Sequence, residues 1–330
     1  MKSGVNTLIV VPISRHLEGR LRDAMMDSTS TFRELSLYGR RVFVVDPFPK
    51  NSMVISPEEA MLIDGGLYAR GLKPEGTIVD VNGIQIGGKR LVIAAGPCAV
   101  ESEEQVMTVA ESVKKLGADM LRGGAFKPRT SPYSFQGLGA EGLRLLRKAS
   151  DATGLPVVSE IMDLADYPLF DQDVDMLQIG SRNSQNFSML RNLGRTEKPI
   201  LLKNGMGNTV SEWLNSAEYL LSGGNGNIVM CYRGTRGFED GTRFTMDSGV
   251  IPVMRKRTHL PICADPSHPA GNRAYVESLT LAAVASGADM IEIEVHNDPD
   301  NALSDSSQQL TFEEFSRLSG NARKLSEFLR

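Results

Sequence analysis

The feature that most constrains the fold of this chain is an alternation of apolar runs with helix-like segments from residue 91 to the C-terminus. The apolar runs begin near Leu91, Asp119, Leu155, Val174, Pro199, Asn227, Leu260 and Asp289. The helices expected between them span roughly 104–116, 140–153, 163–170, 184–193, 209–222, 245–257, 273–286 and 311–329. Eight strand–helix pairs predict a (β/α)8 TIM barrel over residues 91–330. An open doubly wound sheet competes, but its Gly-x-Gly-x-x-Gly turn is missing after the first run.

The residues before the barrel predict a smaller unit and a connector. Residues 1–72 are expected to form a small α+β domain, with strands at 8–11 and 42–45 and a helix at 17–26. Residues 73–90 predict a β-hairpin, because apolar positions flank Asn82-Gly83, a strong turn signal. We expect this hairpin to connect the two domains and to lie under the barrel.

Composition excludes some classes of partner. A net charge of −4 argues against a general nucleic-acid or anionic-membrane surface. No apolar stretch approaches the length of a transmembrane helix, so we expect no membrane partner. Three cysteines, an odd and low number, do not make a disulfide framework and indicate the reducing cytoplasm.

Ionisable residues follow the apolar runs, at the end of a parallel barrel where functional side chains collect. In chain order they are Cys98, Arg122, Lys127, Arg129, Glu160, Arg182, Lys203, Arg233, Asp265, His268 and Glu294. Six of these are cations in a chain that is acidic overall. Because guanidinium groups bind phosphate and carboxylate through paired hydrogen bonds, the pattern predicts a substrate with several negative charges.

The same rim gathers a candidate metal site. The thiol of Cys98, the imidazole of His268 and the carboxylates of Glu294 and Asp305 form a mixed set that suits a borderline-soft divalent ion. Simpler interpretations remain open for each residue. Cys98 alone would more often be a small buried hydrophobe, and Asp305 could be a helix N-cap. Lys203 could instead form a Schiff base in a metal-free aldolase.

Several motifs together resemble 3-deoxy-D-arabino-heptulosonate 7-phosphate (DAHP) synthase, in its short microbial type I beta form with an extra N-terminal domain. The most specific is the Lys-Pro-Arg-Thr-Ser run within residues 121–137. The others are Ala-Gly-Pro-Cys at 95–98, Gln-Ile-Gly-Ser-Arg-Asn at 178–183, Asp-Pro-Ser-His at 265–268, and Ile-Glu-Val-His at 293–296 followed by Ser304-Asp305. The resemblance spans about residues 73–330 and implies a barrel whose N-terminal domain is ferredoxin-like and regulatory.

The resemblance implies a metal-dependent condensation of phosphoenolpyruvate with erythrose 4-phosphate, the first step of the shikimate pathway. The implied ligands of one divalent ion (Mn²⁺, Zn²⁺, Fe²⁺ or Co²⁺) are Cys98, His268, Glu294 and Asp305. The implied substrate-binding residues are Arg122, Lys127, Arg182, Lys203 and Arg233, with Glu160 and Asp265 beside them, and Arg129 and Thr130 for the aldose phosphate. The implied catalytic residues are Cys98, Lys127, Lys203 and His268. A homotetramer or homodimer is the implied assembly.

Several positions depart from the pattern of that family and leave alternatives open: the loops at 204–208 and 232–237, and Pro269-Ala270 after His268. Asn204 stands where this subgroup usually has arginine, and Tyr232 stands where glutamate is expected. One alternative is therefore a paralogue that condenses phosphoenolpyruvate with a different phosphorylated aldehyde. A non-enzymatic ligand sensor is another. Residues 1–72 match the family's regulatory domain poorly, so feedback inhibition is not assumed.

Overall fold

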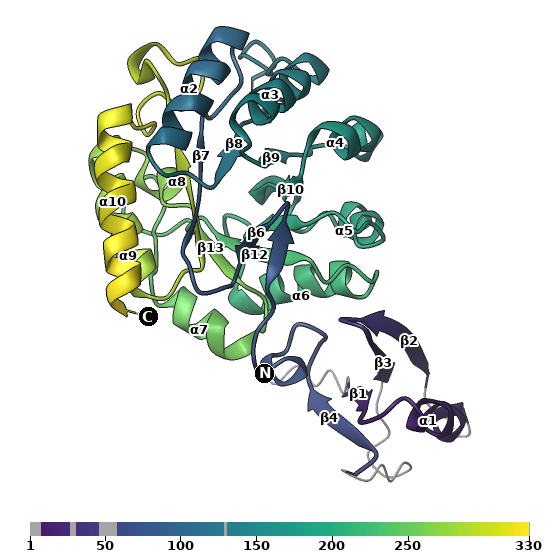
Figure 1. Cartoon of the computed structure of the whole chain (residues 1–330). Helices are drawn as coiled ribbons and strands as arrows, with labels where there is room; N and C mark the ends of the chain where they lie inside the picture. The colour runs from purple at the N-terminus through teal and green to yellow at the C-terminus, as the bar shows by residue number, and fades with distance from the viewer. Residues whose placement is uncertain (1–7, 27–30, 46–57, 129–130, 330) are drawn as a thin grey trace.

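A closed barrel of eight parallel strands forms the centre of the computed structural model, which describes residues 8–26, 31–45, 58–128 and 131–329 (Figure 1). The barrel order is β10-β11-β12-β13-β14-β7-β8-β9. The strands are β7 (Val92–Gly96), β8 (Met120–Arg122), β9 (Val157–Glu160), β10 (Met176–Ile179), β11 (Ile200–Lys203), β12 (Ile228–Tyr232), β13 (Ile262–Ala264) and β14 (Met290–Glu294). All eight expected strands are present, which confirms the TIM-barrel prediction.

Helices follow the strands around the outside of the barrel. They are α2 (Glu103–Lys115), α3 (Ala140–Thr153), α4 (Tyr167–Asp173), α5 (Phe187–Leu193), α6 (Val210–Leu221), α7 (Val250–Arg257), α8 (Ser267–Ala270), α9 (Arg273–Ala285) and α10 (Phe312–Leu329). The expected start at residue 245 was wrong for α7, because Thr245 exchanges backbone hydrogen bonds with Thr235 inside a loop. No helix in the described ranges is long and apolar enough to cross a membrane.

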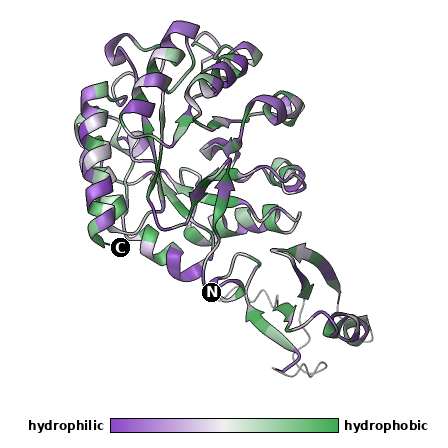
Figure 2. Cartoon of the chain, viewed as in Figure 1, coloured by the Kyte–Doolittle hydropathy of each residue, from purple (hydrophilic) through white to green (hydrophobic). Residues whose placement is uncertain are grey.

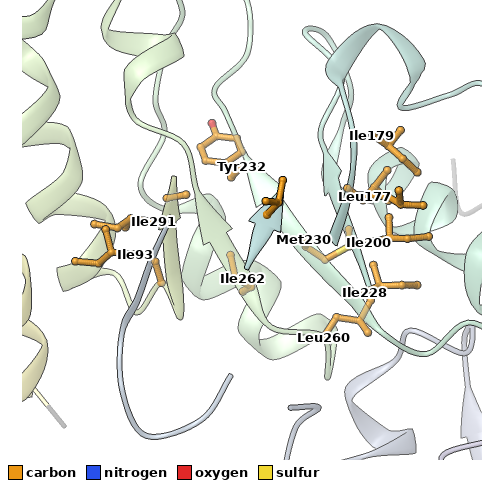
Figure 3. Packing of buried hydrophobic residues seen from close by; sticks show 14 of the residues in the cluster. Ile93, Leu177, Ile179, Ile200, Ile228, Met230, Tyr232, Leu260, Ile262 and Ile291 are labelled. Atoms are coloured by element: carbon orange, nitrogen blue, oxygen red, sulfur yellow. The ribbon is translucent and has the colours of Figure 1, made fainter. Parts of the chain in front are cut away.

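Period-two alternation along each strand divides the core into an outer and an inner part. Outward-facing residues such as Ile93, Ile200, Ile262 and Ile291 belong to the buried layer beneath the helices (Figure 3). The helices show hydrophilic and hydrophobic colours along their length, as expected for elements with one buried face (Figure 2).

The inward-facing residues change in character from one end of the barrel to the other. Those nearer the amino ends of the strands are apolar or weakly polar: Val92, Met120, Val158, Met176, Leu201, Val229, Cys263 and Met290. Val79, Val81 and Ile86 of the hairpin β5 (Val79–Val81) and β6 (Ile84–Ile86) join this cluster, so the hairpin closes that end of the barrel. Nearer the carboxyl ends the inward positions are polar or charged: Arg122, Glu160, Gln178, Lys203, Glu292 and Glu294.

The N-terminal unit is an antiparallel sheet in the order β2-β3-β1-β4 with one helix in its described part. Its elements are β1 (Leu8–Pro12), α1 (Leu17–Met26), β2 (Phe32–Leu37), β3 (Arg40–Val45) and β4 (Ala60–Asp64). The strand order is that of a ferredoxin-like sheet. Strands β2 and β4 were not expected from the sequence, whereas α1 was.

This unit contacts the barrel near α6 and α7, where it lies below them in Figure 1. The Tyr38 hydroxyl donates to the Gly226 carbonyl at 3.2 Å, and the tyrosine ring meets the edge of His259 at 5.5 Å between centroids. His259 is buried, and its Nε2 and Nδ1 lie 2.8 Å from the Leu67 carbonyl and the Thr77 hydroxyl. Burial raises the pKa of Tyr38 to about 12 and lowers the pKa of His259 to about 4. His259 lies just before β13, at the end of the barrel opposite the charged layer.

Candidate active and metal site

A cavity of about 110 Å³ opens at the carboxyl ends of the barrel strands. Its lining includes six cationic side chains: Arg122, Lys127, Arg182, Lys203, Arg233 and Arg243. Glu160, His268 and Asp305 line it as well. The structure thus brings most of the expected rim residues to one cavity. Arg129 and Thr130 lie outside the described residues.

Three of the four expected metal ligands form one compact group. Their ligand atoms, on Cys98, Glu294 and Asp305, all lie within 4.8 Å of one another. The side chain of His268 lies beside this group: its Nε2 is 3.8 Å from Glu294 Oε1. Its Nδ1 is 2.7 Å from Asp265 Oδ2. The donors are a thiol, two carboxylates and a neighbouring imidazole, which together fit a divalent transition metal or zinc.

Glutamine side chains on the loop after β14 hold this group in place. Gln308 Nε2 donates to Glu294 Oε2 at 2.6 Å and to Asp305 Oδ2 at 3.4 Å. Gln309 Oε1 accepts from the Cys98 amide at 2.9 Å. Asp305 has a positive φ of 44° and lies well before the start of α10, so the N-cap interpretation was wrong. The two glutamines were not expected, although their positions just after Asp305 place them on the same loop.

Lys127 lines the cavity and contacts the group formed by Cys98, Glu294 and Asp305, called the metal-ligand group below. Its Nζ donates to the Cys98 carbonyl at 2.9 Å and to Cys98 Sγ at 3.1 Å. Burial, together with the Glu294 carboxylate, raises the pKa of Cys98 to about 12, although the Lys127 ammonium acts in the opposite direction. Without a cation, Cys98 is therefore a neutral thiol. A bound divalent ion would take the thiolate form and release the proton.

Lys203 is held by two carboxylates in the charged layer of the barrel. Its Nζ lies 2.7 Å from Asp265 Oδ2 and 2.7 Å from Glu292 Oε2. Burial acts to lower the pKa of Lys203, but the two carboxylates outweigh it and raise that pKa well above its usual value. Lys203 is therefore a fixed positive charge. For Asp265, burial acts to raise the pKa, but His268 and Lys203 bring it well below its usual value.

Arg122 and Arg233 are both buried, but they differ in their partners. Arg122 Nη1 donates to the Pro97 carbonyl at 2.7 Å and to Glu294 Oε1 at 3.2 Å. Arg233 stacks on Phe244, with Cζ 3.9 Å from the ring centroid, and its Nη1 is buried without a hydrogen-bond partner. Burial lowers the pKa of Arg233. A buried cation without a counterion favours the binding of an anion from solution.

Asn204 and Gly180 shape the cavity wall. Asn204 Oδ1 accepts from the Arg233 amide at 2.8 Å, and its Nδ2 donates to the Gly234 carbonyl at 3.0 Å. Asn204 therefore fixes the backbone that carries Arg233. Gly180 leaves room for Glu160, since a Cβ at this position would lie 1.9 Å from Glu160 Oε1. Arg182, just beyond Gly180, keeps an exposed side chain.

Arg243 and Phe244 are cavity residues that the sequence did not reveal. Arg243 Nη1 donates to Asp305 Oδ1 at 3.4 Å and to Gln308 Oε1 at 3.1 Å. Both residues belong to the loop between β12 and α7, part of which was expected to be helical. No strand ends near them, so the rule that located the other residues could not have found them.

Comparisons with known proteins agree with this arrangement. The model of the DAHP synthetase I family matches residues 73–329. A phospho-2-dehydro-3-deoxyheptonate aldolase of Thermotoga maritima is 48% identical over 263 residues, which cover 80% of this chain and 78% of that protein. A 2-dehydro-3-deoxyphosphooctonate aldolase of Geobacter sulfurreducens is 32% identical over 247 residues, which cover 69% of this chain and 89% of that protein. The crystal structure of the Thermotoga maritima DAHP synthase matches 98% of both chains with a TM-score of 0.79 and 40% identity.

Proposed function

Because the chain belongs to the DAHP synthetase I family, we propose that it condenses phosphoenolpyruvate with erythrose 4-phosphate and water to give DAHP and inorganic phosphate. The observation that carries this proposal is the cavity in which six cations border a thiol–carboxylate group. The two reactants bring two phosphates and a carboxylate, so they need several fixed positive charges to lie close together. The product would enter the shikimate pathway.

Phosphoenolpyruvate would occupy the deeper part of the cavity. Arg122 and Lys203 are buried and fixed by carboxylates, which suits them to hold the enolpyruvate end. Arg233 has no carboxylate partner within hydrogen-bond reach of Nη1, so its charge is available for the phosphate, as is that of Arg182, which lines the same cavity. Arg129 and Thr130 remain our proposal for the aldose phosphate.

Cys98, His268, Glu294 and Asp305 would hold one divalent metal ion. When bound, such an ion polarises the aldehyde oxygen as a Lewis acid. Asp265 would orient His268, because Asp265 Oδ2 lies 2.7 Å from His268 Nδ1. The other ring nitrogen of His268, Nε2, then faces Glu294. Gln308 would keep the Glu294 and Asp305 carboxylates in place.

The reaction then needs positioning and proton transfer from the chain. A bond forms between C3 of phosphoenolpyruvate and the aldehyde carbon, and the aldehyde oxygen takes up a proton. Water adds at C2, and the bond between C2 and the phosphate oxygen breaks to release phosphate and leave a ketone. Lys127 is our candidate for the proton transfer at the aldehyde oxygen, because its ammonium lies in the cavity next to the metal-ligand group.

A Schiff-base mechanism at Lys203 has little support. The nucleophile in that chemistry is a neutral amine, whereas Lys203 lies between two carboxylates that favour its charged form. Treatment with borohydride and the product, whose C2 ketone could form an imine with a neutral lysine, should therefore leave the mass of the protein unchanged. A mass increase that disappears in Lys203→Ala would restore this alternative.

The second candidate function is the condensation of phosphoenolpyruvate with a longer aldose phosphate. The relative from Geobacter sulfurreducens is named for an eight-carbon product, which requires a five-carbon aldose beside the three carbons of the enolpyruvate. The departures at Asn204 and Tyr232 lie next to Arg233, which lines the cavity. The higher identity to the heptonate enzyme favours the four-carbon aldose.

The test is phosphate release from phosphoenolpyruvate with a panel of aldose phosphates, using metal-stripped protein and the same protein reconstituted with Mn²⁺. We expect turnover with erythrose 4-phosphate, dependent on metal, and about a hundredfold lower kcat/KM with five-carbon aldoses. Turnover of a five-carbon aldose alone would support the second candidate. Binding of phosphoenolpyruvate without turnover of any aldose would support a sensor.

We also propose a homotetramer or homodimer located in the cytoplasm. The three described cysteines are free thiols, which fits a reducing compartment. Light scattering on the purified protein would determine the assembly.

A further inference from the structure

One buried carboxylate in the barrel belongs neither to the metal-ligand group nor to the substrate-binding residues. Glu292 lies on β14 two residues before Glu294, so both side chains face the barrel interior. It is only 2% exposed and does not line the cavity. Glu292 therefore lies beneath the site, where it can contact the residues that line the cavity but not a ligand inside it.

Glu292 connects two of the cationic cavity residues across the barrel. Its Oε2 lies 2.7 Å from Lys203 Nζ, and its Oε1 lies 3.6 Å from Arg122 Nε. In the barrel order, β11 with Lys203 and β8 with Arg122 lie on opposite sides of β14. Neither oxygen of Glu292 has a hydrogen bond of normal geometry. The carboxylate is thus held by ion pairs alone.

Packing does not explain a carboxylate at this position. The next inward residue along the same strand is Met290, and its neighbours Val92 and Met120 show that the interior accepts apolar side chains. Replacing buried ionic groups by apolar ones of similar volume is often neutral or stabilising. A buried carboxylate with no backbone or hydroxyl donor is therefore a poor choice for stability alone.

The geometry around Lys203 indicates what the carboxylate does. An ammonium group has three N–H donors. Asp265 accepts from Lys203 Nζ in a hydrogen bond of 2.7 Å, and Glu292 lies at the same distance. Lys203 also lines the cavity. With two carboxylates fixing the ammonium group, an N–H that does not donate to Asp265 can point at an anion in the cavity.

We propose that Glu292 is a positioning residue that, together with Asp265, fixes the Lys203 ammonium for the anionic enolpyruvate group of the substrate. This inference rests on the proposed function for the identity of the anion. Asp265 alone would leave Lys203 with one partner that also contacts His268. The second carboxylate sets the location of Lys203 independently of the histidine.

A purely electrostatic role for Glu292 makes the opposite prediction for binding. If Glu292 only balanced charge, removing its negative charge from beneath an anion site would tighten phosphoenolpyruvate binding. If Glu292 positions Lys203, the same change weakens binding. Glu292→Asp separates the two roles further, because it keeps the charge but moves the carboxylate away from Lys203.

The experiment is calorimetry of phosphoenolpyruvate binding to the full-length, Mn²⁺-loaded protein, which needs no aldehyde. The variants are Glu292→Gln, Glu292→Asp, Lys203→Ala and the double variant Lys203→Ala/Glu292→Gln. Glu218→Gln is the matched control, because Glu218 is a half-buried carboxylate on α6 that accepts from the Leu67 and Tyr68 amides at the N-terminal unit.

We expect Glu292→Gln and Glu292→Asp each to weaken phosphoenolpyruvate binding by roughly fivefold or more, and Glu292→Gln to have less than about a twofold further effect in the Lys203→Ala background. In turnover assays we expect Glu292→Gln and Glu292→Asp to lower kcat by about tenfold and to change the KM for the aldose by less than about twofold. Glu218→Gln binds as the wild type does, and every variant keeps one metal per chain.

Tighter or unchanged binding in Glu292→Gln would overturn the proposal, as would an equal further loss in the Lys203→Ala background. If Glu292→Gln does not fold, Glu292→Asp alone tests the positioning role. Wild-type affinity of Glu292→Asp for phosphoenolpyruvate would then refute the proposal. Failure of the proposed function gives a different result: no aldose is turned over by the wild type, whereas the coupling between Glu292 and Lys203 is still measurable by calorimetry.

Discussion

The Lys127 ammonium contacts Cys98 at two atoms, the carbonyl oxygen at 2.9 Å and Sγ at 3.1 Å. Lys127 follows β8 and Cys98 follows β7, so the contact joins the ends of two neighbouring strands. A Cβ at Gly124 would lie 2.7 Å from the Cys98 carbonyl and 2.9 Å from Lys127 Cδ, so glycine is needed for this approach. The contact places an ammonium group beside Cys98 at the edge of the cavity, which suits the proton transfer proposed for Lys127.

Lys127→Met should separate chemistry from metal binding. Because Lys127 donates to the thiol and is not a ligand itself, we expect the variant to bind one metal per chain. We expect kcat to fall by about a hundredfold or more, the usual effect of losing a proton-transferring group. Metal analysis and steady-state kinetics on the same sample measure both. Loss of the metal in this variant would show that Lys127 acts by holding Cys98.

Cysteine variants test the metal-ligand group directly. Cys98→Ala removes the thiol donor, so we expect metal affinity to fall by about a hundredfold or more and activity to fall with it. Cys263→Ala is the control, since Cys263 is equally buried on β13 but lies in the apolar layer. Titration of chelator-stripped protein with Mn²⁺ gives the affinities. Equal affinities for the two variants would contradict the assignment of Cys98.

Arg233→Met should weaken the binding of phosphoenolpyruvate without lowering the stability of the folded protein. Arg233 is buried with one guanidinium nitrogen unpartnered, so the apo protein loses little by its replacement. We expect the free energy of unfolding to be unchanged or higher by about 1 kcal/mol. Phosphoenolpyruvate affinity should fall by about tenfold or more. Arg144→Met, at an exposed arginine on α3, is the control for both measurements. A destabilised variant with normal affinity would mean that Arg233 is structural.

His259 should make the stability of the protein depend on pH. Its folded pKa is about 4, below the value of about 6.5 expected in the unfolded chain. The unfolded chain therefore takes up this proton first as the pH falls. The neutral imidazole makes its full contribution to the free energy of unfolding above about pH 6.5. This contribution, up to about 3 kcal/mol, is lost as the pH falls to about 4.

His259→Gln provides the comparison for this pH dependence. Glutamine can still donate to the Leu67 carbonyl and accept from Thr77, but it does not titrate. Urea denaturation from pH 7.5 to 4.5 should show the wild type losing more stability than the variant. Parallel curves would show that His259 is not the group that titrates.

The barrel and the ionisable side chains around its rim could be predicted from the sequence because both follow from strand ends. An apolar run fixes the strand, and the next polar residue lies at the rim, which is how Cys98, Lys203 and Glu294 were located. The strand β2 was missed because polar and charged residues interrupt its apolar positions. The strand β4 is a short apolar run, which periodicity alone cannot assign to a strand or to a helix.

Other parts of the site depend on contacts that a sequence does not record. Glu292 lies inside a strand and not after one, although its period-two relation to Glu294 was visible. Arg243 reaches the cavity from a loop whose path depends on the pairing of Thr235 with Thr245. His268 was predicted as a ligand, but whether its imidazole joins Cys98, Glu294 and Asp305 around one ion stays a prediction.

The most direct test is anomalous diffraction from crystals grown with Zn²⁺ and phosphoenolpyruvate. We predict a single site per chain, with Cys98 Sγ at about 2.3 Å and His268 nitrogen at about 2.0–2.1 Å from the metal, and oxygens of Glu294 and Asp305 completing the set. Phosphoenolpyruvate should contact Arg122, Lys203 and Arg233. A metal bound without Cys98 and His268, or phosphoenolpyruvate bound away from these cations, would contradict the account.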